Sequence, residues 1–101
     1  MFGPFKKVSQ SEQQMLTKLS LELIDQIDKI QSNHDFYFAM PAKQRDGITK
    51  YHGAAYNCLK YGQSWDGSDN MQRVMWNAFF KQLSAASKIM EQTLNIIEEN
   101  S

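Results

Sequence analysis

SQSEQQMLTKLSLELIDQIDKIQS, residues 9–32, decides the fold class. Ser9 followed by Glu12 has the pattern of a capping box, in which each side chain accepts a hydrogen bond from the backbone N–H of the other residue. Apolar residues then recur at steps of three and four, which is the spacing of one helix face. They are Leu16, Leu19, Leu23, Ile27 and Ile30, flanked by Met15, Leu21 and Ile24. The stretch predicts an amphipathic helix over residues 9–32.

A second long apolar pattern predicts a helix over residues 68–98. Its apolar positions, at steps of three and four, are Met75, Phe79, Leu83, Ala86, Met90, Leu94 and Ile97. Trp76 and Phe80 make this stripe wider than one antiparallel neighbour would cover, and some 30 residues of helix run about 45 Å. We therefore expect this helix to join two copies of the chain in a homodimer. The expected interface residues are Trp76, Phe80, Leu83, Met90, Leu94 and Ile97.

Residues 41–61 predict a shorter and weaker helix between the two long ones. Pro41 suits the first turn of a helix, but Gly47 and Gly53 each cost about 1 kcal/mol relative to alanine. With an N-terminal arm over residues 1–8, the chain of 101 residues is expected to form one all-α domain. The predicted architecture is a small three-helix bundle with up-down-up topology.

Composition excludes several classes of protein. Eleven basic and eleven acidic side chains leave no net charge, which is unlike a general nucleic-acid binder. Cys58 is the single cysteine, so the fold does not depend on a disulfide, and we expect it to be a small buried hydrophobic residue. No run approaches the ~18 apolar residues of a membrane span, and no signal peptide is evident. A cytoplasmic location without membrane contact is expected.

The sequence also lacks a recognisable catalytic constellation. His34, His52 and Cys58 do not share a helix face, so we expect no metal site. No serine lies in a strained glycine-rich turn, and no phosphate-binding loop is present. A helix-turn-helix reading fails because Asp66 and Asp69 would meet DNA phosphates with the wrong charge. We expect neither an enzyme nor a cofactor, and no nucleic-acid partner.

HDFYFAMP, residues 34–41, places three aromatic residues between two predicted helices. Because the residue before a proline is disfavoured in helical conformation, this bridge is expected to be extended. Phe36 and Phe38 would then point one way and Tyr37 the other. Either these rings close the end of the bundle, or they anchor a protein partner, as aromatic residues often do. Trp65, in the other long connection, is a further candidate anchor.

The middle segment, residues 39–62, is the most basic part of the chain, with four basic side chains against the single acidic residue Asp46. Its candidate residues for binding an anionic small molecule, such as a nucleotide, are Lys43, Arg45, Lys50, Tyr51, His52, Tyr56 and Lys60. Lysines can hold phosphates and tyrosines can stack on bases. The alternative is that the tyrosines cover helix flanks and the lysines only solvate an exposed face.

By elimination, the sequence predicts a non-enzymatic module that binds another protein. An inhibitor, immunity protein or adaptor of bacterial or phage origin fits a small neutral domain with exposed rings. Two other functions remain open: an oligomer that sequesters an anionic small molecule, and a purely structural helical oligomer.

Overall fold

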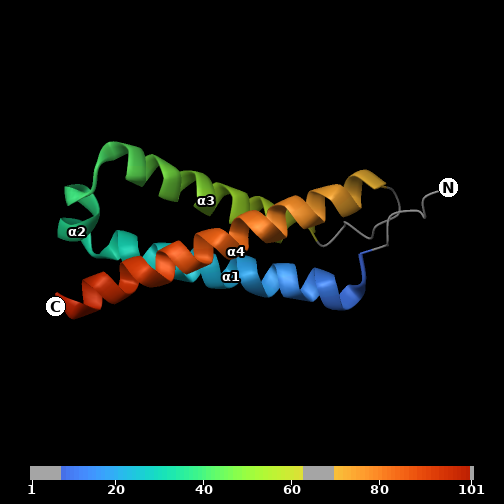
Figure 1. Cartoon of the computed structure of the whole chain (residues 1–101), viewed down its shortest axis with the longest axis horizontal. Helices are drawn as coiled ribbons and strands as arrows, with labels where there is room; N and C mark the ends of the chain where they lie inside the picture. The colour runs from blue at the N-terminus through green and yellow to red at the C-terminus, as the bar shows by residue number, and fades with distance from the viewer. Residues whose placement is uncertain (1–7, 63–69, 101) are drawn as a thin grey trace.

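The computed structural model describes residues 8–62 and 70–100. They form four helices, α1 (Gln10–Ser32), α2 (His34–Ala39), α3 (Ala42–Tyr61) and α4 (Asn70–Glu99), and this part of the chain contains no strand. The helices pack into an elongated body that measures 54 × 23 × 20 Å along its principal axes (Figure 1). The expectation of an all-α fold is confirmed, with four helices rather than three.

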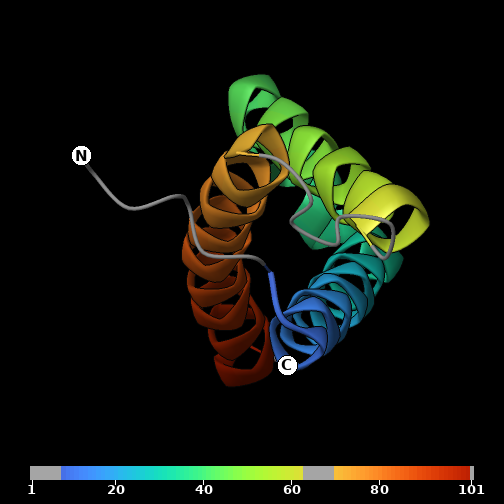
Figure 2. The ribbon, with the colours of Figure 1, turned by 90° about the vertical axis from the view of Figure 1, so that its right-hand side faces the viewer.

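The two ends of the body differ. α1 runs toward the end where α2 lies, α3 returns from it, and α4 runs toward it again, so that the C-terminus lies at the α2 end (Figure 1). α1 packs extensively against both α3 and α4, whereas α3 and α4 contact each other much less. They also diverge toward the α2 end, as the two views show (Figure 1, Figure 2).

α1 begins as its sequence predicts. The backbone N–H of Glu12 donates to Ser9 Oγ at 3.1 Å, and the backbone N–H of Ser9 donates to Glu12 Oε1 at 3.1 Å. The capping box therefore satisfies two backbone donors that an uncapped helix start would leave free.

The core lies between α1 and the two other long helices, α3 and α4. Its fully buried side chains come from all three long helices, and burial excludes water from apolar surface. The buried apolar residues are Val8, Leu16, Leu23, Ile27, Ile30, Ile48, Ala55, Cys58, Trp76, Leu83, Ala86 and Met90. Cys58 is confirmed as a core residue, and it contacts a buried serine, Ser20, whose hydroxyl donates to the backbone oxygen of Leu16 at 2.8 Å.

The expected extended bridge over residues 34–40 is wrong, because His34–Ala39 is the short helix α2. The side chain of Asn33 caps it by accepting from the backbone N–H of Phe36 at 3.4 Å. The restriction before Pro41 acts on Met40 alone, whose ψ of 150° ends the helix. As a result Tyr37 packs partly against the core while Phe38 is exposed, which is not the alternation that an extended chain would give.

The wide stripe of α4 faces the inside of a single chain. Leu83 and Met90 are 0% and 2% exposed, and Trp76 is buried as well. Phe80, Leu94 and Ile97 are partly buried and pack against the same core. Within one chain this stripe therefore packs against the core, and the predicted homodimer through these six residues stays a prediction.

Candidate functional site

Metal-ligating side chains are dispersed in the part of the chain that the structure describes, and its cysteine thiol is buried. Among residues 8–62 and 70–100, no three histidine, cysteine or acidic side chains lie close enough to hold a metal ion. Burial raises the pKa of the Cys58 thiol to about 11, against a smaller opposing effect of its hydrogen bond with Ser20. Such a thiol stays protonated and is a poor nucleophile. The helices in this part of the chain also include none that is long and apolar enough to cross a membrane.

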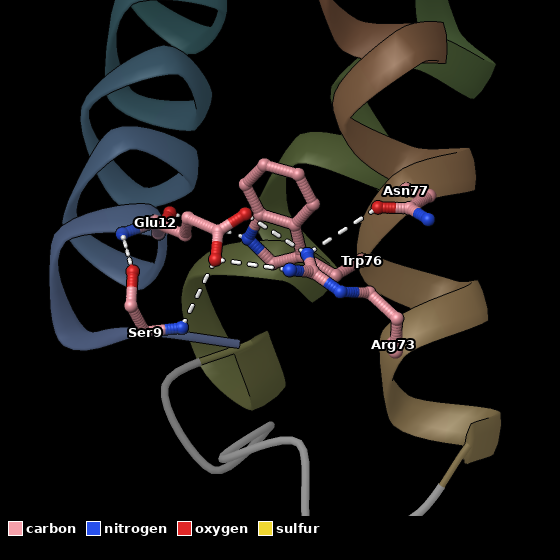
Figure 3. Close-up of polar contacts among 5 residues, drawn as sticks. All are labelled: Ser9, Glu12, Arg73, Trp76 and Asn77. Carbon is pink, nitrogen blue, oxygen red and sulfur yellow. Dashed lines mark hydrogen bonds and ion pairs between the residues drawn. The ribbon is translucent and has the colours of Figure 1, made fainter. Parts of the chain in front are cut away.

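The most polar cluster joins the start of α1 to α4 (Figure 3). Arg73 is 7% exposed, and its two terminal nitrogens donate to the two carboxylate oxygens of Glu12 at 2.9 and 3.1 Å. Trp76 Nε1 donates to the backbone oxygen of Glu12 at 3.2 Å, and Arg73 also donates to Asn77 Oδ1 at 3.4 Å. We call Glu12, Arg73 and Trp76 the α1–α4 clamp.

The electrostatics of the α1–α4 clamp indicate a structural role. The hydrogen bonds from Arg73, and then that from the backbone of Ser9, lower the pKa of Glu12 from 4.5 to about 2. A carboxylate with both oxygens engaged and such a low pKa is a poor proton carrier at neutral pH. The two-pronged contact instead holds α4 against the first turn of α1.

A second cluster lies around α2 and is exposed. Phe38 is 63% exposed, and its ring stacks on His34 with the ring centroids 6.3 Å apart. Tyr37 meets Phe38 edge to face at 5.4 Å, and the Arg45 guanidinium of α3 lies 5.8 Å from the Phe38 ring centroid. Gln31 Nε2 of α1 donates to the Tyr37 hydroxyl at 3.5 Å. We call His34, Tyr37, Phe38 and Arg45 the α2 aromatic patch.

The predicted partner-binding residues therefore do not share one environment. Among the three that the structure describes, Phe38 is the most exposed, whereas Phe36 and Tyr37 are half-buried. Trp65 lies outside the described residues. The α2 aromatic patch adds two residues that the partner-site prediction left out. His34 meets Phe38 because α2 is a helix and brings positions four apart into contact, and Arg45 reaches Phe38 from α3.

The seven predicted anionic-ligand residues lie on several faces of α3 rather than around one pocket. His52 faces α1, where its Nε2 lies 3.7 Å from Asp28 Oδ1, and its ring stacks on Tyr56 at 6.3 Å. Lys60 lies over the ring of Tyr61, 5.2 Å from its centroid. The remaining four lie elsewhere on α3: Arg45 in the α2 aromatic patch, Tyr51 toward α4, and Lys43 and Lys50 exposed.

An apolar groove lies between α3 and α4, next to the C-terminal end of α2. Its volume is about 210 Å³, and Ile48 and Met90 are its buried members. The full lining is Met40, Gln44, Gly47, Ile48, Tyr51, Ile89, Met90 and Thr93. We call this set the α3–α4 groove. It exists because α3 and α4 both pack on α1 and diverge from each other (Figure 2).

Ile89, on the α4 side of the α3–α4 groove, belongs to a second apolar stripe of α4. The sequence analysis did not predict this stripe. Its large members are well exposed: Met71 65%, Val74 47%, Ile89 46% and Ile96 49%. With Ala78 and Ala85 these residues recur at steps of three, four, seven, four and seven, so they share one helix face. We call this face the α4 open stripe. The helical spacing of these residues could have been found in the sequence, but the core stripe of α4 has more apolar residues and was the pattern identified.

Comparison with known proteins does not assign a function. The chain matches no family model, no curated protein and no solved structure. Two surfaces of this chain can themselves indicate a function, the α2 aromatic patch and the α3–α4 groove.

Proposed function

We propose that this protein is a non-enzymatic binding module that works by associating with another protein at the α2 end of the bundle. An inhibitor or adaptor works in this way, because it needs a surface and no reaction chemistry. The proposal agrees with the polar geometry of the described residues, in which the strongest ion pair, Glu12–Arg73, connects two helices.

The exposure of Phe38 is the observation that supports this proposal most. A phenylalanine that is 63% exposed gains little from folding, because most of its apolar surface stays in water. Its ring is nevertheless held in place by His34 and by Arg45. A pre-positioned aromatic ring loses little conformational entropy when a partner covers it, which is typical of interface anchors.

The test compares Phe38→Ala with Tyr56→Ala in tagged protein recovered from its own host and measured by native mass spectrometry. Tyr56 is a matched control, because it is also aromatic, is 59% exposed and stacks on a histidine, but lies on α3. We expect a stoichiometric protein partner with the wild type and with Tyr56→Ala, and its loss with Phe38→Ala.

Two results would contradict the proposal. Recovery of the wild type without any foreign protein would remove the proposed function. Equal recovery of a partner with both variants would move the binding surface away from α2. Circular dichroism of each variant checks that helicity is kept.

A further inference from the structure

We infer that the α3–α4 groove, together with the α4 open stripe, binds an amphipathic helix of a partner protein whose flanking residues are acidic. This inference rests on the proposed function, since it names the chemistry of the protein partner. It concerns a different surface from the α2 aromatic patch, so the two can be tested separately.

The shape of the surface between α3 and α4 suits the binding of a helix. Two roughly antiparallel helices with a groove between them offer the site into which a third helix packs, in the manner of helix-in-groove recognition. Gly47 lines the α3–α4 groove, and a Cβ atom at this position would meet nothing within 4 Å, so the groove is open here. The surface is therefore hollowed and lies between two rigid elements.

The length of the α4 open stripe also suits a helix. From Met71 to Ile96 the α4 open stripe covers 25 steps along the helix, about 38 Å at ~1.5 Å per residue. A small molecule would cover only part of such a stripe. Another helix, with apolar residues at the same spacing, matches it along several turns.

Basic side chains border both the α3–α4 groove and the α4 open stripe. Lys43 and Lys50 stand four residues before and three residues after Gly47, so helix geometry places them on its side of α3. Lys81 and Lys88 stand three residues after Ala78 and Ala85, which places them beside the α4 open stripe. All four lysines are exposed.

Few acidic residues oppose these four lysines. α3 contains one acidic residue, Asp46, and it lies one turn before Lys50. Glu91 stands about 160° around α4 from Ile89. Glu98 lies on the opposite side of α4 from Ile96, whereas Glu99 stands three residues after Ile96 and is the one acidic residue of α4 beside the α4 open stripe. A neutral chain thus has an apolar surface with a basic border, which is complementary to an acidic amphipathic helix.

A second copy of the chain fits this surface less well. If two α4 open stripes packed antiparallel with Met71 opposite Ile96, Lys81 would come within one turn of Lys88 of the other copy. Like charges at that distance disfavour association. On α1, the exposed Leu21 lies one turn from both Lys18 and Asp25, and Asp25 is paired with Lys29 at 3.1 Å, so this face has mixed charge rather than an acidic border.

The experiment uses a phage-displayed library of helical peptides about 20 residues long. Apolar positions are fixed at helix spacing, and the flanking positions vary among Glu, Gln and Lys. We expect selection on the full-length protein to enrich Glu at the flanks. In titrations of a selected peptide, we expect Lys43→Glu/Lys50→Glu to weaken binding about tenfold or more.

Gly47→Leu and Gly53→Leu form the matched pair for the groove. Both glycines lie in α3 with open space at Cβ, but only Gly47 lines the α3–α4 groove. We expect Gly47→Leu to weaken the selected peptide about tenfold or more, and Gly53→Leu to leave its Kd within about twofold. Because both variants gain the same helix propensity, the difference reports occupation of the groove.

Several results would overturn this inference. Enrichment of Lys or Gln, failure to enrich any peptide, or equal effects of the two glycine variants would each do so. A dimer in sedimentation that Gly47→Leu dissociates would assign the groove to a second copy instead. If the host partner is lost with Phe38→Ala while these tests fail, the inference fails and the proposed function stands.

Discussion

α4 packs against α1 along one side and against α3 along another, and we call these two contacts the α1–α4 seam and the α3–α4 seam. The two seams are built differently. Against α1, it is fixed at two places by polar contacts: the α1–α4 clamp, and a pair of hydrogen bonds between Gln26 and Ser87 at 3.1 and 3.4 Å. Against α3, it diverges and leaves the α3–α4 groove. The α1–α4 seam therefore specifies the fold, whereas the α3–α4 seam leaves apolar surface available for binding.

This difference explains how one helix can have two apolar stripes without conflict. The core stripe is fully covered, and its residues contribute to stability through burial. The α4 open stripe contributes little to the isolated fold, because about half of each large side chain stays in water. Substitutions in the two stripes should thus differ sharply in their effect on the free energy of unfolding.

The largest expected effect is in the core stripe. Leu83 is 0% exposed, so Leu83→Ala should lower the free energy of unfolding by about 3 kcal/mol or more, through lost burial and a cavity. Ile89→Ala, in the α4 open stripe, should cost less than about 1 kcal/mol. Urea titration followed by circular dichroism measures both. Equal losses would mean that the open stripe is covered in solution, and the contrast between the seams would fail.

The next effect is in the α1–α4 clamp. Glu12→Gln leaves the buried guanidinium of Arg73 without its anionic partner, which should cost about 3 kcal/mol in the same titration. The matched control is Glu22→Gln, on an exposed face of α1, which should change stability by less than about 0.5 kcal/mol. A Glu12→Gln variant as stable as the control would show that the clamp does not hold the seam.

The same carboxylate gives a pH dependence with a definite sign. The folded-state pKa of Glu12, about 2, lies below its ordinary value of 4.5, so its stabilising contribution is present above pH 4.5. That contribution is lost as the pH falls toward 2. The stability difference between the wild type and Glu12→Gln should therefore close by about 2 kcal/mol between pH 5 and pH 2. A constant difference across this range would exclude the Glu12–Arg73 ion pair as its cause.

Local patterns in the sequence predicted local structure well. Ser9 and Glu12 predicted the start of α1, and periodic apolar residues predicted which sides of the long helices are buried. Periodicity could not tell which neighbour covers a stripe: Leu83 and Met90, which were predicted to meet a second copy, are already buried within the single chain. The clamp of Glu12 with Arg73 joins residues 61 apart in the sequence, and neither has a local pattern that predicts it.

The same limit applies to the candidate site. Aromatic residues around α2 were identified by type, but the single capping side chain of Asn33 changed their directions and placed Phe38 rather than Tyr37 outside. The α3–α4 groove depends on how two helices diverge, which no property of either helix alone determines. Sequence reasoning thus found the elements and several of the surface residues, but not which of those residues meet.

A smaller effect is expected where α1 and α4 join near their middle. Ser87→Ala removes the hydroxyl that donates to Gln26 Oε1 at 3.1 Å, which should cost about 1 kcal/mol. Ser84→Ala, on the same helix one turn earlier, should cost less than about 0.5 kcal/mol. Native-state hydrogen exchange of α4 amides checks whether the loss is confined to this seam. Equal effects would show that the Gln26–Ser87 contact does not help to fix α4.

The smallest expected effect has the opposite sign and belongs to the open seam. Gly47→Ala should raise the free energy of unfolding by about 0.5–1 kcal/mol, because alanine is the better helix former and its Cβ meets no atom within 4 Å. Gly53→Ala should do the same for the same reason. If Gly47→Ala instead destabilised the protein while Gly53→Ala stabilised it, α3 and α4 would have to close on each other at this point. The α3–α4 groove would then be filled in solution, and the two seams of α4 would be alike.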